Sequence, residues 1–310
     1  MPALLILVLM FLGHLPTWIA AATPANRGDA AAMLALANST GTASPLGWGV
    51  KSSDPCDGTW AGVTCNAVGR VTSIHASHAG LAGVLHASDL GNLTFLAELD
   101  LSFNSLTTPT GDLPLLSSPL QHLRSLDLRN NSFYGIPEGF FAGFPNIETI
   151  ALDDNPMISQ IRPDVLTCSR LRSFSANNIR LLIRFPYYFG STLVFPALER
   201  LSLAGNEITG TVPPGFGNHS KIKYLDISRQ KDSLEPGSSL MGRMDFISGM
   251  ESLVEVRMDH DGFVGPLPDT SKLVNLRVFS AAGNKLCGVP KFAGSVAVNL
   301  DGNPDVGSPC

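Results

Sequence analysis

Apolar side chains recur along the chain in the spacing L-x-x-L-x-L-x-x-N-x-L. Clear copies begin at Leu96, Leu123, Ile147 and Leu198, and looser copies begin at 71, 171, 222, 253 and 276. The central L-x-L alternates with period two, which predicts a short strand with one buried face. The nine starts lie 23 to 31 residues apart, and a recurrence of this length is typical of a repeat protein.

One such strand cannot bury its leucines alone, so successive repeats must stack and pair their strands in parallel. The pattern therefore predicts an α/β repeat fold, a leucine-rich-repeat solenoid with a curved parallel sheet on its concave face and a cap at each end. We expect about nine repeats over residues 71–291. The long spacing between the starts at 222 and 253 predicts an insertion that loops out at 231–248.

An asparagine follows most strands, at the point where the chain turns away from the sheet. Its amide can satisfy backbone groups that the strands no longer pair. Gln230 and Asp261 are partial substitutes, whereas Ile179 cannot act in this way, so the series should break in the repeat that starts at Leu171. We expect a structural ladder of Asn104, Asn131, Asn155, Asn206 and Asn284.

Both ends of a repeat array need covering. Residues 23–70 predict an N-terminal cap, with an amphipathic helix at 29–37 and a hairpin at 48–65 closed by a Cys56–Cys65 disulfide. Residues 292–310 predict a C-terminal cap with a last strand at 295–300, where Cys287 and Cys310 can pair. Cys168 is left over, and we expect a buried free thiol there.

The first residues predict secretion. An apolar run at 3–12 precedes Ala20–Ala22, which indicates a signal peptide over 1–22. Secretion permits disulfides, and it fits four glycosylation sequons, at Asn38, Asn92, Asn130 and Asn218. No later stretch approaches the ~18 apolar residues of a membrane span. We therefore expect an extracellular protein, held at the plasma membrane only as part of a longer receptor.

Composition and motifs argue against several function classes. The net charge is −5, without a basic block, which makes nucleic acid and anionic lipid poor partners. The sequence contains no P-loop, no G-x-S-x-G and no H-E-x-x-H. His75 and His78 have an odd spacing on a strand, so their side chains diverge. We expect no enzyme activity, no cofactor and no metal site.

Binding is therefore expected on the concave face, where the variable residues of each strand point outward. Its centre carries small polar residues, and arginine mixes with aspartate towards the C-terminus. Tyrosine and arginine dominate the energetics of protein interfaces. The predicted ligand-binding residues are Arg200, Tyr224, Arg229, Arg257, Asp153 and Asp154.

Two further patterns are typical of plant proteins: the cap form W…DPC…W-x-G-V-x-C at 48–65 and the G-x-[IVL]-P motif at 210–213. With these motifs, the chain resembles plant leucine-rich-repeat receptor-like kinases, above all the transmembrane-kinase (TMK) subfamily. The likeness runs from about residue 29 to 310, and it matches the first repeat block of that subfamily. The segments that carry it are RVTSIHASHAGLAGVL (70–85), LRSFSANN (171–178), FPALERLSLAGNEITGTVP (195–213) and FVGPLPDTSKL (263–273).

The resemblance implies a receptor-like ectodomain that binds a peptide or a partner receptor ectodomain in plant cell-surface signalling. The subfamily continues into a second repeat block, a membrane helix and a kinase that this sequence lacks, so kinase activity is not expected. Cys287 also departs from the position of the subfamily's closing cysteine pair. The alternative is a free-standing defence protein of the cell wall space that resembles polygalacturonase inhibitors. The irregular spacing at 231–248 favours the receptor-like interpretation.

Overall fold

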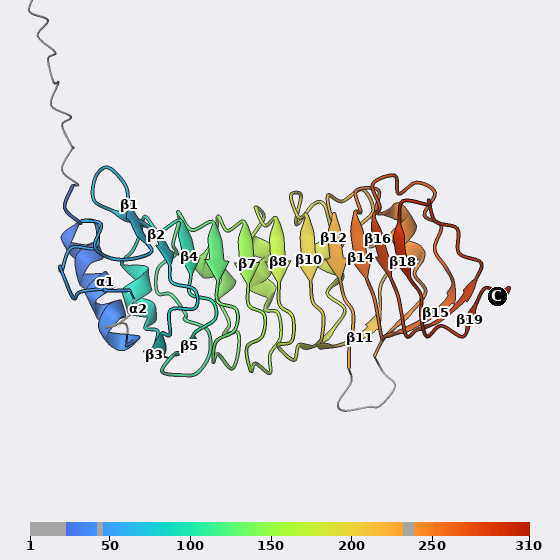
Figure 1. Ribbon diagram of the computed structural model, residues 1–310, viewed down its shortest axis with the longest axis horizontal. Helices are drawn as coiled ribbons and strands as arrows, with labels where there is room; N and C mark the ends of the chain where they lie inside the picture. The colour runs from blue at the N-terminus through green and yellow to red at the C-terminus, as the bar shows by residue number, and fades with distance from the viewer. Residues whose placement is uncertain (1–22, 42–45, 232–238) are drawn as a thin grey trace, which may run out of the picture.

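The computed structural model describes residues 23–41, 46–231 and 239–310 of the chain. It is an elongated solenoid whose large sheet runs along its whole length (Figure 1). The order of this sheet is β1-β2-β4-β6-β7-β8-β10-β12-β14-β16-β18. Its strands are β1 (Val63–Cys65), β2 (Val71–His75), β4 (Glu98–Asp100), β6 (Ser125–Asp127), β7 (Thr149–Ala151), β8 (Ser173–Ser175), β10 (Arg200–Ser202), β12 (Tyr224–Asp226), β14 (Glu255–Arg257), β16 (Val278–Ser280) and β18 (Ala297–Asn299).

A strand forms at each of the nine predicted starts, and from β2 onward the neighbours are parallel. The middle line of these nine strands is buried, and equivalent residues lie opposite one another, as Leu99 does with Leu126. Their side chains join one continuous apolar core. The predicted solenoid with a parallel sheet is therefore confirmed, because stacking buries leucines that no single repeat could cover.

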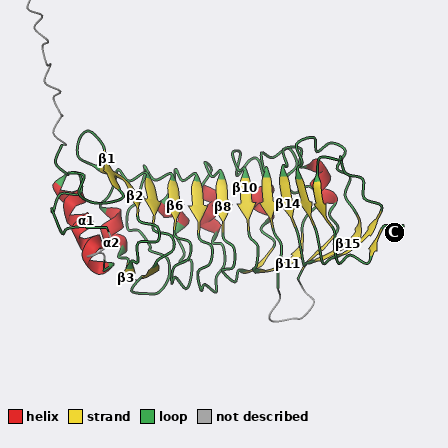
Figure 2. Ribbon diagram, viewed as in Figure 1, coloured by secondary structure: helices red, strands yellow, loops and turns green. Residues whose placement is uncertain are grey.

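A second sheet follows the turns, with the order β19-β17-β15-β13-β11-β9, and β3 pairs with β5 nearer the N-terminus. Short helices lie behind the strands of the large sheet (Figure 2). The strands of the second sheet are β9 (Leu182–Arg184), β11 (Glu207–Thr211), β13 (Leu240–Gly242), β15 (Gly262–Pro266), β17 (Lys285–Gly288) and β19 (Asp305–Val306), and the separate pair is β3 (Ala82–Val84) and β5 (Ser105–Thr107). The helices after the cap are α2 (Ala87–Gly91), η1 (Phe141–Gly143), η2 (Pro163–Thr167), η3 (Tyr187–Gly190) and η4 (Asp245–Gly249).

The predicted loop at 231–248 is wrong for its second half. β13 pairs in parallel with both β11 and β15, and η4 follows it. Leu240, Met244 and Phe246 are fully buried, so apolar anchors hold this stretch in the ordinary repeat path. Residues 232–238 lie outside the described part of the chain.

The N-terminal cap consists of α1 (Arg27–Ser39) and the pair β1–β2, which is antiparallel. Cys56 and Cys65 form a disulfide, and the rings of Trp48 and Trp60 stack 6.0 Å apart. The cap covers the first edge of the core. The predicted signal peptide at 1–22 lies outside the described residues.

At the other end, the predicted cap at 292–310 adds a tenth parallel strand, because β18 pairs with β16. Asn303 takes the ladder position of this repeat and donates to the carbonyls of Ala281 and Leu300, at 2.9 Å each. Cys287 and Cys310 are disulfide-bonded. The repeats therefore continue beyond 291, the boundary expected from sequence.

The ladder residues bond as expected for backbone groups in a buried turn. Asn206 donates to the carbonyls of Ala176 and Leu203, both at 2.8 Å, and accepts from two amides of the preceding repeat. Gln230 reaches the equivalent carbonyls, at 2.9 Å. Ile179 is fully buried and breaks the series in its own repeat. The Asn206 side chain spans that gap by bonding to the backbone of the Ile179 repeat.

Candidate functional site

The concave face has two exposed lines of side chains, one on each side of the buried central line. From β6 to β10 these lines hold small residues, except for Asp127 on β6 and Arg200 on β10. A run of small side chains on adjacent strands leaves the surface hollowed, because the backbone spacing is fixed. The small residues are Ser125, Thr149 and Ser173 in one line and Ala151, Ser175 and Ser202 in the other.

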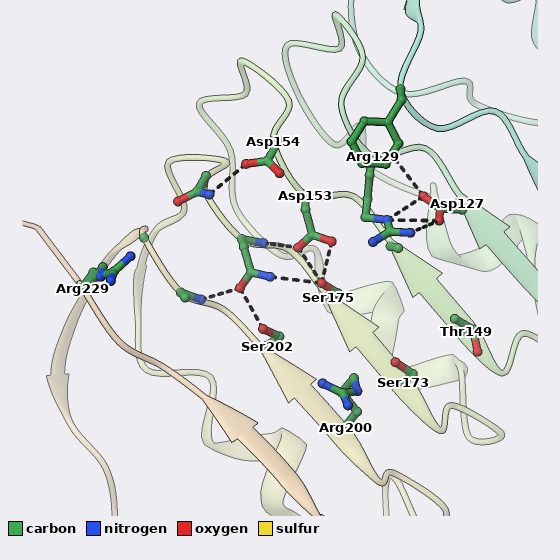
Figure 3. Close-up of a pocket in the computed structure, with 16 residues that line it drawn as sticks. Asp127, Arg129, Thr149, Asp153, Asp154, Ser173, Ser175, Arg200, Ser202 and Arg229 are labelled. Carbon is green, nitrogen blue, oxygen red and sulfur yellow. Dashed lines mark hydrogen bonds and ion pairs between the residues drawn. The ribbon is translucent and has the colours of Figure 1, made fainter. Parts of the chain in front are cut away.

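A hollow of about 600 Å³ lies over these strands. Phe103 and Arg129 line it on the N-terminal side, and Arg200 and Arg229 line it towards the C-terminus. Figure 3 shows the serines of its floor and the arginines around them. Asp153 and Asp154 also line it. The structure thus brings four of the six predicted ligand-binding residues together, and it places Tyr224 against one of them.

One rim of the hollow is built from turn residues with positive φ. Phe103, Asp154, Asn178 and Arg229 occupy the same position in their repeats, with φ from 54° to 60°. Residues other than glycine rarely adopt this conformation. This backbone conformation places their side chains in a row along the rim. The Asn178 side chain donates to the Asp154 carboxylate of the preceding repeat at 2.8 Å.

The carboxylate of Asp153 is hydrogen-bonded to the next repeat. It is 5% exposed, and it accepts from the Ser175 hydroxyl at 2.6 Å and from the Asn177 amide at 2.6 Å. Burial raises its pKa, while these hydrogen bonds act in the opposite direction. Asn177 and Asp259 bridge to the next repeat in the same way. Asp153 thus belongs to a second line of bridging side chains, and its role as a ligand contact stays a prediction.

Arg200 and Tyr224 form one unit on neighbouring strands. The Arg200 guanidinium lies 4.2 Å from the centroid of the Tyr224 ring, because the two residues are in register on β10 and β12. A stacked guanidinium keeps its in-plane N–H groups available for a ligand. Arg229 is exposed on the rim formed by the turn residues with positive φ.

Arg257 lies outside this hollow. Its Nε donates to Glu255, two residues earlier on the same strand, at 2.6 Å. The hydrogen bond to Glu255 is the largest cause of a raised pKa at Arg257. Arg257 therefore lies one strand beyond Tyr224 and does not join the four predicted residues that line the hollow.

Sequence reasoning missed two walls of the hollow. Phe103 is 38% exposed, and its ring stacks on His78 at 4.2 Å. Arg129 forms an ion pair with Asp127 at 2.6 Å and lies 5.9 Å from the Phe103 centroid. The signal was present in the sequence, because Asp127 and Arg129 are two residues apart at the end of a strand and can share one face.

Other predicted features lie away from the hollow or on its edge. All four sequon asparagines are exposed, and Asn130 follows the wall residue Arg129. Cys168 is a buried free thiol, as predicted, and burial raises its pKa to about 12. Within residues 23–41, 46–231 and 239–310, no helix is long and apolar enough to cross a membrane, and no group of side chains is arranged to hold a metal ion.

Family models match this chain in three places. A leucine-rich-repeat N-terminal domain matches residues 26–66, and leucine-rich repeats match 121–179 and 197–219. Together with the parallel solenoid, these matches decide the family. The chain is a leucine-rich-repeat protein. Its matched N-terminal domain coincides with α1 and the disulfide hairpin of the cap.

Among curated proteins, this leucine-rich-repeat chain is similar to two receptor-like kinases of Arabidopsis thaliana. It is 34% identical to TMK2 over 84% of the chain, and 31% identical to TMK4 over 92%. These findings confirm the likeness to the TMK subfamily that the sequence motifs indicated. The chain spans 28% of the length of each of these relatives.

Solved structures support the fold. The ectodomain of the Arabidopsis thaliana receptor kinase GASSHO1/SCHENGEN3 superposes with a TM-score of 0.70 at 22% identity, covering 84% of this chain and 30% of that one. A plant ice-binding protein superposes with a TM-score of 0.63 at 20% identity, covering 92% of this chain and 99% of that one. Proteins with unlike functions thus share this solenoid, so function must be argued from the concave face.

Proposed function

We propose that the chain is an extracellular recognition module, a receptor-like ectodomain that binds a peptide or a partner receptor ectodomain in plant cell-surface signalling. The hollow over β6–β10 carries this proposal, because it is the place where stacked, charged and small polar side chains converge around open volume. Such convergence is typical of a binding surface. The chain resembles a ligand-binding ectodomain rather than a catalytic domain, and we propose that it has no enzyme activity.

The size of the hollow suits an extended segment. Its lining residues come from the repeats of β4 to β12. The strands β6, β7, β8 and β10 are separated by three intervals of about 4.8 Å, which give a floor about 14 Å long. An extended chain rises about 3.3 Å per residue, so about four residues fit across this floor.

The relatives support the same function. The structure of GASSHO1/SCHENGEN3 is of a membrane receptor kinase in complex with CASPARIAN STRIP INTEGRITY FACTOR 2, and HAESA is in complex with the peptide hormone IDA and the co-receptor SERK1. The solenoid is thus used by plant receptors for peptides and for other ectodomains. The TMK-like cap and repeats support a role of this receptor kind for the present chain.

The test is to fill the hollow. Ser173→Trp places a large side chain on its floor, and Val278→Trp is the matched control in the same exposed line on β16. The secreted full chain is screened against an array of random 12-residue peptides and against purified ectodomains of plant receptor kinases. We expect Ser173→Trp to weaken binding at least tenfold and Val278→Trp to leave it unchanged.

Equal binding by the wild type and Ser173→Trp would remove the hollow as the contact surface. A wild-type chain that binds none of these probes, but inhibits a purified polygalacturonase, would replace the receptor-like function with the inhibitor function.

A further inference from the structure

We propose that the chain has a second binding site, separate from the hollow, which takes a small organic amine with an apolar body. The site is a cavity of about 320 Å³ in the N-terminal repeats, where the chain around the start of α2 faces the loop that follows β5 (Figure 1). It shares no lining residue with the hollow. Its volume lies at the lower end of the range for small-molecule sites, about 300 to 1,000 Å³.

The walls of this cavity are mostly apolar and are stiffened by proline. Seven of its twelve lining residues are apolar, and Pro109, Pro114 and Pro137 are among them. A proline ring fixes the backbone φ, so these walls have little freedom to collapse. Leu85 and Leu113 are buried and join the cavity to the core. A preformed apolar cavity can therefore bind a small molecule without a large cost of ordering.

The polar lining residues leave one carboxylate unused. Three of the five are serine or threonine, and their hydroxyls already bond within the protein, as the Thr108 hydroxyl does to the backbone carbonyl of Asp112. The other two are His86 and Asp112, whose side chains make no hydrogen bond or ion pair among the described residues. Asp112 is half-buried. It therefore presents an unpaired carboxylate beside apolar walls.

The charge around the cavity selects a cation. Between Arg70 and Arg124 the sequence has four acidic residues and no lysine or arginine, and Arg70 is already in an ion pair. Arg162, on a later repeat, donates to the Ile136 carbonyl at 3.0 Å and does not line the cavity. An ammonium group at Asp112 would donate a charge-assisted hydrogen bond. The apolar body of the same molecule would be buried against the proline walls.

The probe for this site is phenethylamine. It is compared with phenethyl alcohol, which is neutral, with hydrocinnamate, which has the opposite charge, and with butylamine, which lacks the ring. Dissociation constants are measured by NMR titration of the secreted full chain at neutral pH.

Three variants locate the binding. Asp112→Asn removes the charge and keeps the shape of the side chain, and Thr110→Trp fills the cavity from an exposed position. Glu138→Gln is the matched control, because it removes the same charge at an exposed residue beside Pro137, outside the cavity. Urea unfolding of each variant checks that the solenoid is intact.

We expect the wild type to bind phenethylamine about tenfold or more tightly than each of the other compounds, which lack either the charge that Asp112 bonds or the apolar body. Asp112→Asn should remove the preference over phenethyl alcohol, and Thr110→Trp should weaken the binding of phenethylamine about tenfold or more. Glu138→Gln should change neither. No measurable binding of phenethylamine, equal binding of amine and acid, or a preference that survives Asp112→Asn would overturn the site.

Ser173→Trp, which fills the hollow, separates this site from the proposed function. We expect this variant to bind phenethylamine like the wild type. Binding that is lost in Ser173→Trp and kept in Thr110→Trp would place the amine in the hollow. That result would overturn the second site and leave the recognition function standing.

Discussion

Asp261 is the ladder residue whose chemistry fits its position least. Its Oδ1 accepts from the Gln230 amide at 2.8 Å, whereas its Oδ2 is buried without a hydrogen-bond partner among the described residues. Asn284, one repeat later, donates its amide to the carbonyls of Met258 and Ala281, at 2.7 and 3.0 Å. An ionised carboxylate cannot donate in this way. Asp261 must therefore carry a proton to behave like its neighbours.

The pKa of Asp261 is raised to about 8, mainly by burial; the nearby Asp226 and Asp259 carboxylates also raise this pKa, while the Gln230 N–H bond lowers it. In the unfolded chain the pKa of an aspartate is about 3.9. Because the folded pKa is the higher one, the stabilising contribution of the protonated form is fully present below pH ~4 and is lost as the pH rises towards ~8. Across that window the loss is about 1.4 kcal/mol per pH unit, or roughly 4 to 6 kcal/mol in all.

Asp261→Asn tests this account, because asparagine cannot ionise and supplies the missing N–H donors. Urea unfolding of the wild type and the variant is measured at pH 4.5, 6.0 and 7.5, with exposed Asp301→Asn as the control. We expect the variant's advantage in free energy of unfolding to grow by about 1.4 kcal/mol per pH unit. A constant difference between the two proteins at all three pH values would refute the reasoning, whatever its size.

Three further predictions follow from buried groups. Asn206→Ala removes hydrogen bonds to two carbonyls and two amides and should lower the free energy of unfolding by about 3 kcal/mol or more, measured by urea unfolding. The substitution Asn275→Ala at an exposed position should change it by at most about 0.5 kcal/mol; equal losses would contradict the ladder. Asp29 is fully buried and bonded to Arg70 at 2.8 Å. Asp29→Ala should lower the free energy of unfolding of the cap by about 3 kcal/mol, and an unchanged free energy of unfolding would count against this. The Cys168 thiol should resist alkylation at pH 8 in the folded protein and react in urea; mass spectrometry of labelled peptides decides this.

The solenoid was predictable because the same physical requirements recur along the array, so the same residue types recur at the same spacing in the sequence. An apolar residue lies in the middle line of all ten strands, and a side-chain amide follows the turn in most repeats, so variation at one repeat, such as Ile179, does not hide the pattern. The loop expected at 231–248 shows where this reasoning fails. The spacing there is long, but Leu240 and Met244 anchor its second half, and a count of residues cannot reveal that.

The binding residues were harder to predict, because their state depends on neighbours in other repeats. Asp153 and Asp154 are adjacent in sequence, yet the first is buried beneath Ser175 and Asn177 and the second stands on the rim with positive φ. Only the next repeat decides which carboxylate remains free. The pairing of Arg257 with Glu255 was within reach of the sequence, since residues two apart on a strand share one face.

The same repeat rules confine functional variation to a narrow part of the surface. The central line of the concave face must be apolar and the turn must hold an amide, so only the two exposed lines and the rim can change without loss of stability. Where these lines hold large or charged groups, they pair with each other, as His75 does with Glu98 and Arg257 does with Glu255. Where small residues occupy both lines on adjacent strands, no such pairing is available. The arginines at the edge of that region are then left for a ligand.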